Sequence, residues 1–201
     1  MLCQRLDATN KTDIQKAANL IRAGNLVVFP TETVYGLGAL GLDENAIRKV
    51  FEIKGRSHQK PLSLQVHSAE KALELFDLES HELFWQLAQK YWPGPLTIVA
   101  SKAHHVPFLV TGDLDKVGVR IPAHPVALEL LRLVDLPIVA TSANISEKSS
   151  ATTAEQALLA LGDKISAVLD AGPCQYGLES TVLDISQNPP VVLRRGVLTV
   201  L

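Results

Sequence analysis

The sequence predicts a single α/β domain built on a twisted, mixed β-sheet with surrounding helices, and three observations support this fold class. Short apolar runs alternate with amphipathic segments of helical period along the chain. The 201 residues suffice for one sizeable core and are too few for two. Neither an internal repeat nor an interdomain linker interrupts the pattern, so we expect one domain over residues 1–201.

The helices are predicted from apolar stripes and from the residues at their ends. The first is expected to begin at Thr12, where Gln15 completes a capping box, and to end at Gly24. The second has Asp43 as its N-cap and is expected to end near Lys54. The full set of expected helices covers residues 12–24, 43–54, 69–76, 82–91, 125–134 and 154–161.

The strands are predicted where short apolar runs end at turn residues. In the run 62–66 the apolar residues alternate with Ser63 and Gln65, so this strand should present a polar face to a cleft. The run 117–121 alternates in the same way and places Arg120 opposite its apolar face. The expected strands are 26–29, 62–66, 96–100, 117–121, 137–140, 167–170, 181–185 and 191–193.

Composition and charge argue against several broad classes of protein. Hydrophobic residues make up 47% of the chain and charged residues 20%, as in folded globular proteins. The formal net charge of −2 disfavours a general nucleic-acid-coating protein, although a local positive cleft is compatible with it. No apolar run is long enough for a membrane span, and Cys3 and Cys174 lack CxxC spacing. We therefore expect a cytoplasmic protein with reduced thiols.

Lys54 and Arg56 form a pair of cations where the second helix should end. With Gly55 ending the helix, both side chains can point to one side and reach the same anion. An ordinary basic helix end, favoured by the helix dipole, explains the same spacing and is the more common case. The pair becomes informative only together with other parts of the chain.

The strand 137–140 leads into a polar segment that contains Ser142 and Asn144. In open α/β sheets, ligands bind beyond the carboxyl ends of the strands, and these side chains offer uncharged donors and acceptors. The competing interpretation is structural, because Ser and Asn are also common loop residues that bond to their own backbone.

The segment 36–41 formally matches GxGxxG, the dinucleotide-binding fingerprint. In that motif the first glycine follows the strand directly, whereas six residues, Pro30 to Tyr35, intervene here. A Rossmann dehydrogenase is therefore a weak alternative. The chain also lacks the GxxxxGK[ST] of a P-loop and the GxSxG elbow of a hydrolase.

Taken together, the motifs over residues 26–196 resemble those of the YrdC-type threonylcarbamoyl-AMP synthases. They occur in collinear order as PTETVYGLG at 30–38, KGR at 54–56, PL at 61–62, WPGPLT at 92–97, VRIP at 119–122, TSAN at 141–144, EST at 179–181 and LR at 193–194. The resemblance implies a YrdC-like fold with a concave, positively charged cavity. It also implies an enzyme that makes L-threonylcarbamoyladenylate and pyrophosphate from L-threonine, bicarbonate and ATP, for N6-threonylcarbamoyl modification of adenosine 37 in tRNA.

The resemblance also implies site residues. Lys54 and Arg56 would be catalytic and hold the triphosphate, and Mg²⁺ would accompany ATP as the cofactor. The remaining nucleotide contacts implied are Asn144, Thr152 and Arg194. The threonine and carbamoyl contacts implied are Thr31, Ser63, Arg120, Ser142 and Ser180. No protein-held metal is expected, because the six histidines show no metal-ligand spacing.

The chain resembles the short form of the family, which consists of the YrdC-like domain only. The partner expected from the resemblance is a downstream tRNA-threonylcarbamoyl transferase complex, and weak contact with tRNA itself is possible. Two alternatives stay open: a nucleic-acid-binding protein for tRNA or double-stranded RNA, and a paralogous carbamoyl-adenylate enzyme with a different acceptor.

Overall fold

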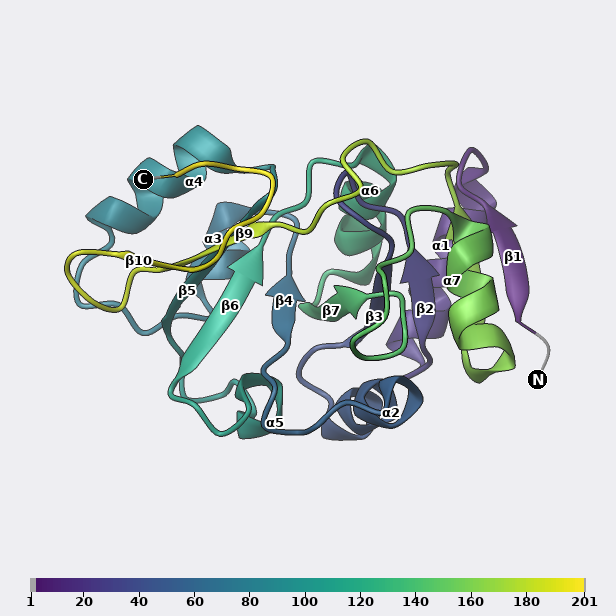
Figure 1. Cartoon of the computed structure of the whole chain (residues 1–201), viewed down its shortest axis with the longest axis horizontal. Coiled ribbons are helices and arrows are strands. Elements are labelled where there is room, and N and C mark those ends of the chain that lie inside the picture. Colours follow the sequence, from purple (N-terminus) through teal and green to yellow (C-terminus); the bar gives the residue numbers. More distant parts are fainter. Residues whose placement is uncertain (1–2, 201) are drawn as a thin grey trace.

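Ten strands form one mixed β-sheet, which a computed structural model describes for residues 3–200. The strands are β1 Gln4–Asp7, β2 Val27–Phe29, β3 Gly36–Leu40, β4 Ser63–Gln65, β5 Leu96–Ser101, β6 Lys116–Arg120, β7 Ile138–Ser142, β8 Ala167–Asp170, β9 Thr181–Asp184 and β10 Val191–Arg194. They lie in the order β1-β8-β2-β3-β7-β4-β6-β5-β9-β10, with β1 and β10 at opposite edges (Figure 1). The predicted α/β fold class is confirmed.

Seven α-helices surround this sheet in the described chain. They are α1 Lys11–Arg22, α2 Glu44–Lys54, α3 Ala69–Leu73, α4 Glu82–Tyr91, α5 Phe108–Thr111, α6 Pro125–Val134 and α7 Ala154–Leu161, and a 3₁₀ turn follows at Gly162–Lys164. The bounds of α4, α6 and α7 agree with those that the sequence predicts. No helix within residues 3–200 combines the length and the apolar character needed to cross a membrane.

The half of the sheet that contains β2 is buried on both faces. Val27 and Phe29 pack in one core cluster with the apolar stripes of α1 and α6. Val28 points the opposite way and joins the second cluster, together with Val50 of α2 and Ala157 of α7. Because side chains alternate along a strand, a continuous apolar run such as this predicts burial from both sides.

The other half of the sheet has one packed face and one open face. Leu64 of β4, Val119 of β6 and Ile98 of β5 belong to the core cluster that also contains Phe84 of α4. The alternate residues on these strands, among them Ser63 and Gly118, line a cavity instead. The polar face predicted for residues 62–66 is therefore confirmed, and it forms part of the cavity floor.

Helix α2 ends as the sequence predicts. The Asp43 carboxylate accepts hydrogen bonds from the backbone N–H groups of Asn45 and Ala46. Gly55 adopts the left-handed conformation at φ 59°, which terminates the helix at little steric cost because glycine has no Cβ. Lys54 is therefore the last helical residue, and Arg56 already lies in the following loop.

The structure departs from the predicted elements in six main ways. Residues 36–40 form β3 rather than a loop, and β7 continues through Ser142, so the polar segment begins inside a strand. Helix α1 is capped by Asn10, whose side chain accepts from the Thr12 N–H, and not by Thr12 itself. Strand β1 and the short helix α5 are absent from the prediction, and α3 stops three residues before Phe76.

Candidate functional site

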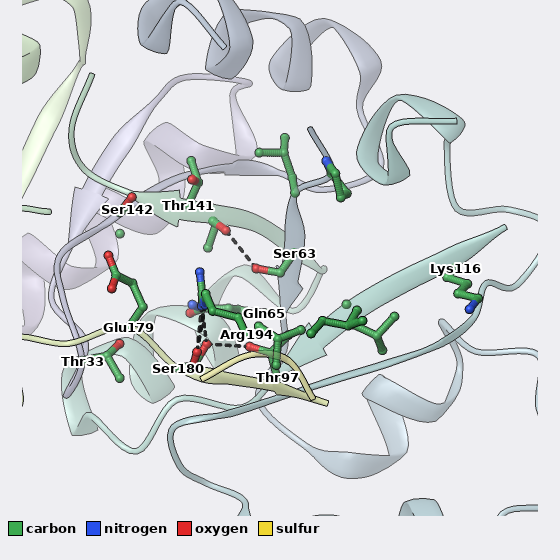
Figure 2. Close-up of a pocket in the computed structure, with 18 of the residues that line it drawn as sticks. Thr33, Ser63, Gln65, Thr97, Lys116, Thr141, Ser142, Glu179, Ser180 and Arg194 are labelled. Atoms are coloured by element: carbon green, nitrogen blue, oxygen red, sulfur yellow. Dashed lines mark hydrogen bonds between the residues drawn. The ribbon is translucent and has the colours of Figure 1, made fainter. Parts of the chain in front are cut away.

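A cavity of about 730 Å³ lies over the open face of the sheet. Strands β4, β5, β6, β7 and β9 supply its floor, and the segments around Thr31, Arg56 and Arg194 supply its walls. Figure 2 shows hydroxyl-bearing side chains at one end of this cavity and Lys116 at the other. The volume is within the range of sites that enclose small molecules.

Four of the predicted threonine and carbamoyl residues line the cavity: Thr31, Ser63, Ser142 and Ser180. The Ser63 hydroxyl donates to the Ala140 carbonyl at 3.1 Å. The Ser142 hydroxyl donates to Asn144 Oδ1 at 2.6 Å. Each hydroxyl is thus oriented by the protein and keeps lone pairs that can accept from a ligand.

Arg56 and Arg194 bring positive charge to this cavity from separate walls. Arg56 donates to the carbonyls of Lys60 and Pro61, at 3.2 and 2.8 Å, and Arg194 donates to the Ser180 carbonyl at 2.9 Å. Burial lowers the pKa of Arg56, and repulsion from Arg194 lowers it further. Two guanidinium groups that repel each other across a cavity favour an anion between them.

Lys54 is buried below the cavity and does not line it. Its ammonium group donates to the Ser142 carbonyl at 2.5 Å, the Asn144 carbonyl at 2.6 Å and Asn144 Oδ1 at 3.1 Å. Burial first, and then repulsion from Arg56, lower its pKa to about 8. That Lys54 and Arg56 reach one anion stays a prediction; in this structure Lys54 is bonded to the 142–144 segment.

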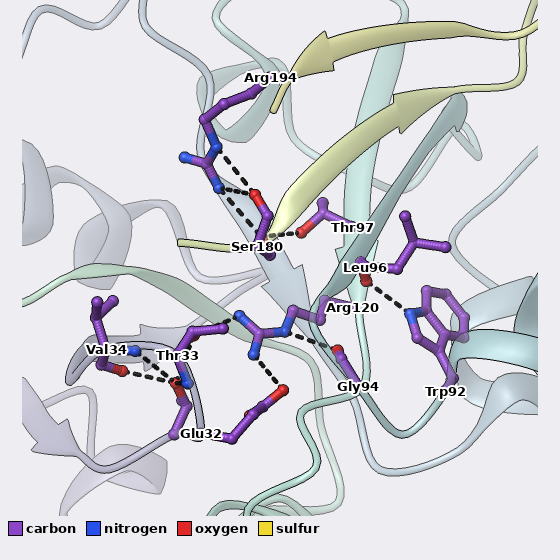
Figure 3. A network of polar contacts seen from close by, with 11 residues as sticks. Glu32, Thr33, Val34, Trp92, Gly94, Leu96, Thr97, Arg120, Ser180 and Arg194 are labelled. Carbon is purple, nitrogen blue, oxygen red and sulfur yellow. Dashed lines mark hydrogen bonds and ion pairs between the residues drawn. The ribbon is translucent and has the colours of Figure 1, made fainter. Parts of the chain in front are cut away.

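Arg120 is also buried outside the cavity surface, in an ion pair with Glu32 at 2.6 Å (Figure 3). It donates further to Thr33 Oγ1 at 2.9 Å and to the Gly94 carbonyl at 3.1 Å. Burial lowers the pKa of Arg120 and the neighbouring Glu32 carboxylate raises it, so the pair keeps the guanidinium charged. The contact between Arg120 and a substrate carboxylate stays a prediction; in this structure the Arg120 guanidinium group is paired with Glu32.

Asn144 and Thr152, two predicted nucleotide contacts, are bonded to other protein groups and do not line the cavity. The Asn144 amide group donates to the Lys148 carbonyl, and its Oδ1 accepts from Lys54 and Ser142. The Thr152 hydroxyl donates to Gln156 Oε1 at 3.0 Å.

Several cavity residues lie outside the predicted site. Thr33 bonds to Thr31 Oγ1 at 2.8 Å, and Thr97 bonds to Ser180 Oγ at the same distance. The motifs PTETVYGLG and WPGPLT already contain both threonines, and alternation along the strand places Gln65 beside Ser63. The sequence therefore contains these residues within recognised motifs. The pairing of Thr97 with Ser180 cannot be predicted from sequence spacing, because the two residues are 83 positions apart. At the far end Lys116 pairs with Asp184 at 2.9 Å.

Fold and cavity together define a class of protein: an α/β protein with a cavity on an open sheet face that is lined by two arginines and several hydroxyl groups, without a P-loop. The family model Sua5_yciO_yrdC, described as telomere recombination, matches residues 19–196. The chain belongs to the Sua5/YciO/YrdC family.

Known relatives agree with this assignment. The chain is 50% identical over 183 residues to a threonylcarbamoyl-AMP synthase from Pyrococcus abyssi, covering 91% of this chain and 54% of the relative. It is 41% identical over 193 residues to one from Bacillus subtilis, covering 96% of this chain and 56% of the relative. The structure of P. abyssi Sua5 complexed with L-threonine superposes with a TM-score of 0.92 at 46% identity, covering 98% of this chain and 58% of the other. The chain thus spans about half the length of these relatives.

Proposed function

We propose that this chain synthesises L-threonylcarbamoyladenylate and pyrophosphate from L-threonine, bicarbonate and ATP. The observation that carries the proposal is that the guanidinium groups of Arg56 and Arg194 line one cavity. The hydroxyl groups of Thr31, Ser63, Ser142 and Ser180 line the same cavity. The names of the relatives support it, as does the L-threonine complex of the P. abyssi protein. The positive character of the whole cavity stays a prediction, because Asp115, Glu179 and Asp184 also line it.

In this proposal the triphosphate lies between Arg56 and Arg194. Both groups would stabilise the charge that develops on the leaving pyrophosphate, which is the main requirement of a phosphoryl or nucleotidyl transfer. Lys54 would act from below, by orienting the 142–144 segment and by adding its charge to the field. Asn144 and Thr152 remain assigned to the nucleotide, and a direct contact would require that segment to move towards the cavity.

The threonine and carbamoyl groups would occupy the end lined by Thr31, Ser63, Ser142 and Ser180. Arg120 remains assigned to this end, and it would also support the end through Thr33, because its bond to Thr33 continues through Thr31 Oγ1 to the Val34 carbonyl. No covalent enzyme intermediate is needed, since positioning and charge stabilisation can supply most of the acceleration.

Mg²⁺ would accompany ATP. Residues 3–200 contain no group of three or more His, Cys, Asp or Glu side chains arranged to hold a metal ion, so the residues present fit an ion that the phosphates carry. When bound, Mg²⁺ would neutralise phosphate charge.

The proposal extends to the cellular role. The adenylate would serve the N6-threonylcarbamoyl modification of adenosine 37 in tRNA, in the cytoplasm, where a downstream transferase complex would receive the labile product. The two cysteines described are both free, which is compatible with a reducing compartment. We also keep the single YrdC-like domain over 1–201 as a proposal.

The test is an assay with ATP, Mg²⁺, bicarbonate and a panel of amino acids, following pyrophosphate release and detecting the adenylate by mass spectrometry. We expect product only when threonine and bicarbonate are both present. Arg56→Ala should lower turnover about 10²-fold or more, as expected for removal of a transition-state charge partner. Arg132→Ala, an exposed arginine on α6, is the matched control and should retain full activity. Pyrophosphate release that ignores threonine and bicarbonate would contradict the proposal.

A further inference from the structure

The carboxyl group of Glu179 lines the hydroxyl end of the cavity without an ion-pair partner among the described residues. Its Oε1 accepts a hydrogen bond from Ser150 Oγ, which is its one protein contact of this kind within residues 3–200. Figure 2 draws the carboxyl group on the same side of the cavity as Ser142 and Thr33. A charged group in this position is available to a ligand.

The other two acidic residues that line the cavity differ from Glu179. The Asp184 carboxylate is almost completely buried and is bonded to Lys116 at 2.9 Å and to the Ser186 hydroxyl at 2.7 Å. Asp115 is exposed and neighbours Lys116, which Figure 2 places at the opposite end. Glu179 is thus the carboxylate that remains open at the hydroxyl end.

A carboxylate at this end opposes the binding of a triphosphate. Arg194 is near enough for the Glu179 charge to raise its pKa against the effect of burial, yet its guanidinium group bonds to Ser180 and not to Glu179. A carboxylate that has no ion-pair contact within residues 3–200 and lies beside an anion site favours a cationic or proton-donating ligand group. Among the substrates of the proposed reaction, the α-ammonium group of the amino acid has this chemistry.

We propose that Glu179 is a catalytic residue that binds the amino group of threonine and transfers its proton during carbamate formation. This inference rests on the proposed function. The bound ammonium group first releases one proton to solvent through the carboxylate. The amine then attacks the carbon of bicarbonate, so that the C–N bond forms and the C–OH bond breaks. Glu179 takes the second proton from nitrogen and passes it to the departing hydroxide, which leaves as water.

This step balances and returns Glu179 to its carboxylate form. Threonine with a neutral amino group and one bicarbonate give one N-carboxylate and one water, with a net charge of −2 on each side, including the carboxylate of threonine. The carbamate oxygen is then free to attack the α-phosphorus at the arginine end. Proton transfer by a positioned side chain contributes about 10²–10⁴-fold to rates of this kind.

The test separates the two halves of the reaction in the variant Glu179→Gln, which keeps an oxygen for Ser150. The forward half-reaction is followed as adenylate formed from ATP, threonine and bicarbonate. The second half-reaction is followed as ATP formed in a single turnover from threonylcarbamoyl-AMP and pyrophosphate, which needs no C–N chemistry. We expect Glu179→Gln to lose about 10²-fold or more in the forward assay and to stay within about threefold of the unaltered protein in ATP formation. Glu129→Gln removes one charge from an exposed position on α6, outside the cavity, and should leave both rates unchanged.

The outcomes distinguish the possible failures. Full forward activity of Glu179→Gln overturns the inference, and so does an equal loss in both assays, which would indicate a structural role or a Mg²⁺ ligand. If the unaltered protein is inactive in both directions, the proposed function itself fails. Should Glu179→Gln not fold, Glu179→Asp answers the same question, because it keeps the charge and withdraws it by one methylene group.

Discussion

At the scale of single residues, Lys54 combines a charge with almost complete burial. Its ammonium group is held by three oxygens of the 142–144 segment and, within residues 3–200, by no carboxylate. Burying a lysine disfavours its charged form, and the repulsion from Arg56 acts in the same direction, so its pKa is lowered to about 8. A bound anion would favour the charged form. Lys54 is therefore the group that should make ligand affinity depend on pH.

We predict that ATP affinity falls as the pH rises through about 8, where Lys54 loses its proton. The sign for stability is the opposite. The pKa of Lys54 is about 8 in the folded protein and 10.5 in the unfolded chain, so the unfolded chain binds the proton more tightly. Below pH 8 both states are charged, and the burial of this charge lowers the free energy of unfolding in full. Between pH 8 and 10.5 the folded protein holds the neutral amine, so the free energy of unfolding rises with pH. Calorimetric titration with Mg-ATP from pH 7.5 to 9.5 should show about tenfold weaker binding at the upper limit. Lys54→Met should remove this pH dependence, and an unchanged slope in that variant would exclude Lys54 as its source.

At the scale of elements, β3 shows why a strand can escape prediction. Its sequence, Gly36 to Leu40, contains two glycines and no polar alternation, and a buried connection of six residues, 30–35, joins it to its antiparallel neighbour β2. The reason for a glycine at position 38 is spatial. A Cβ atom there would lie 2.6 Å from the ring of Phe29, which is fully buried on the neighbouring strand β2. Backbone and aromatic ring therefore pack directly against each other.

We predict that Gly38→Ala destabilises the protein by about 1–3 kcal/mol, the usual range for overpacking a core. Gly36→Ala is the matched control on the same strand, because its Cβ would lie 3.4 Å from the same ring, at ordinary contact distance. Urea unfolding of both variants measures the difference in the free energy of unfolding. Equal stabilities for the two variants would show that the Phe29 ring can move aside.

At the scale of the whole molecule, the cavity unites segments that are far apart in the sequence. Thr31 and Arg56 come from the first third of the chain, Ser142 follows much later, and Ser180 and Arg194 come from its last part. The sheet order brings them together, because β7 from the later part lies between β3 and β4 from the earlier part. A ligand in the cavity therefore contacts both ends of the chain at once.

We predict that Mg-ATP stabilises the protein in a single unfolding transition. At a concentration 100 times the dissociation constant, binding adds about 2.7 kcal/mol to the free energy of unfolding. For a protein of this size that corresponds to a rise in Tm of about 5–10 °C. Scanning calorimetry with and without Mg-ATP measures this shift, and Arg56→Ala should reduce it. Two separate transitions, of which only one responds to the nucleotide, would contradict a common folding unit for the cavity walls.

Local signals are sufficient for much of the fold because they act within one or two turns of chain. Asp43 and Gly55 define α2 through caps that involve neighbouring backbone groups, and the alternation around Ser63 assigns one face of β4 to the cavity. Such features depend on backbone geometry and on side-chain direction, and both are determined by residues close together in the sequence.

Tertiary structure alone decided which of the cations line the cavity and which are buried outside it. The sequence analysis assigns four cations to anionic groups of the substrates: Lys54, Arg56, Arg120 and Arg194. Folding joins Arg120 to Glu32, 88 positions away, and buries Lys54 among carbonyl oxygens, whereas Arg56 and Arg194 line the cavity. The physical reason is desolvation: a buried charge must find a partner within the fold, and that partner depends on which strands become neighbours.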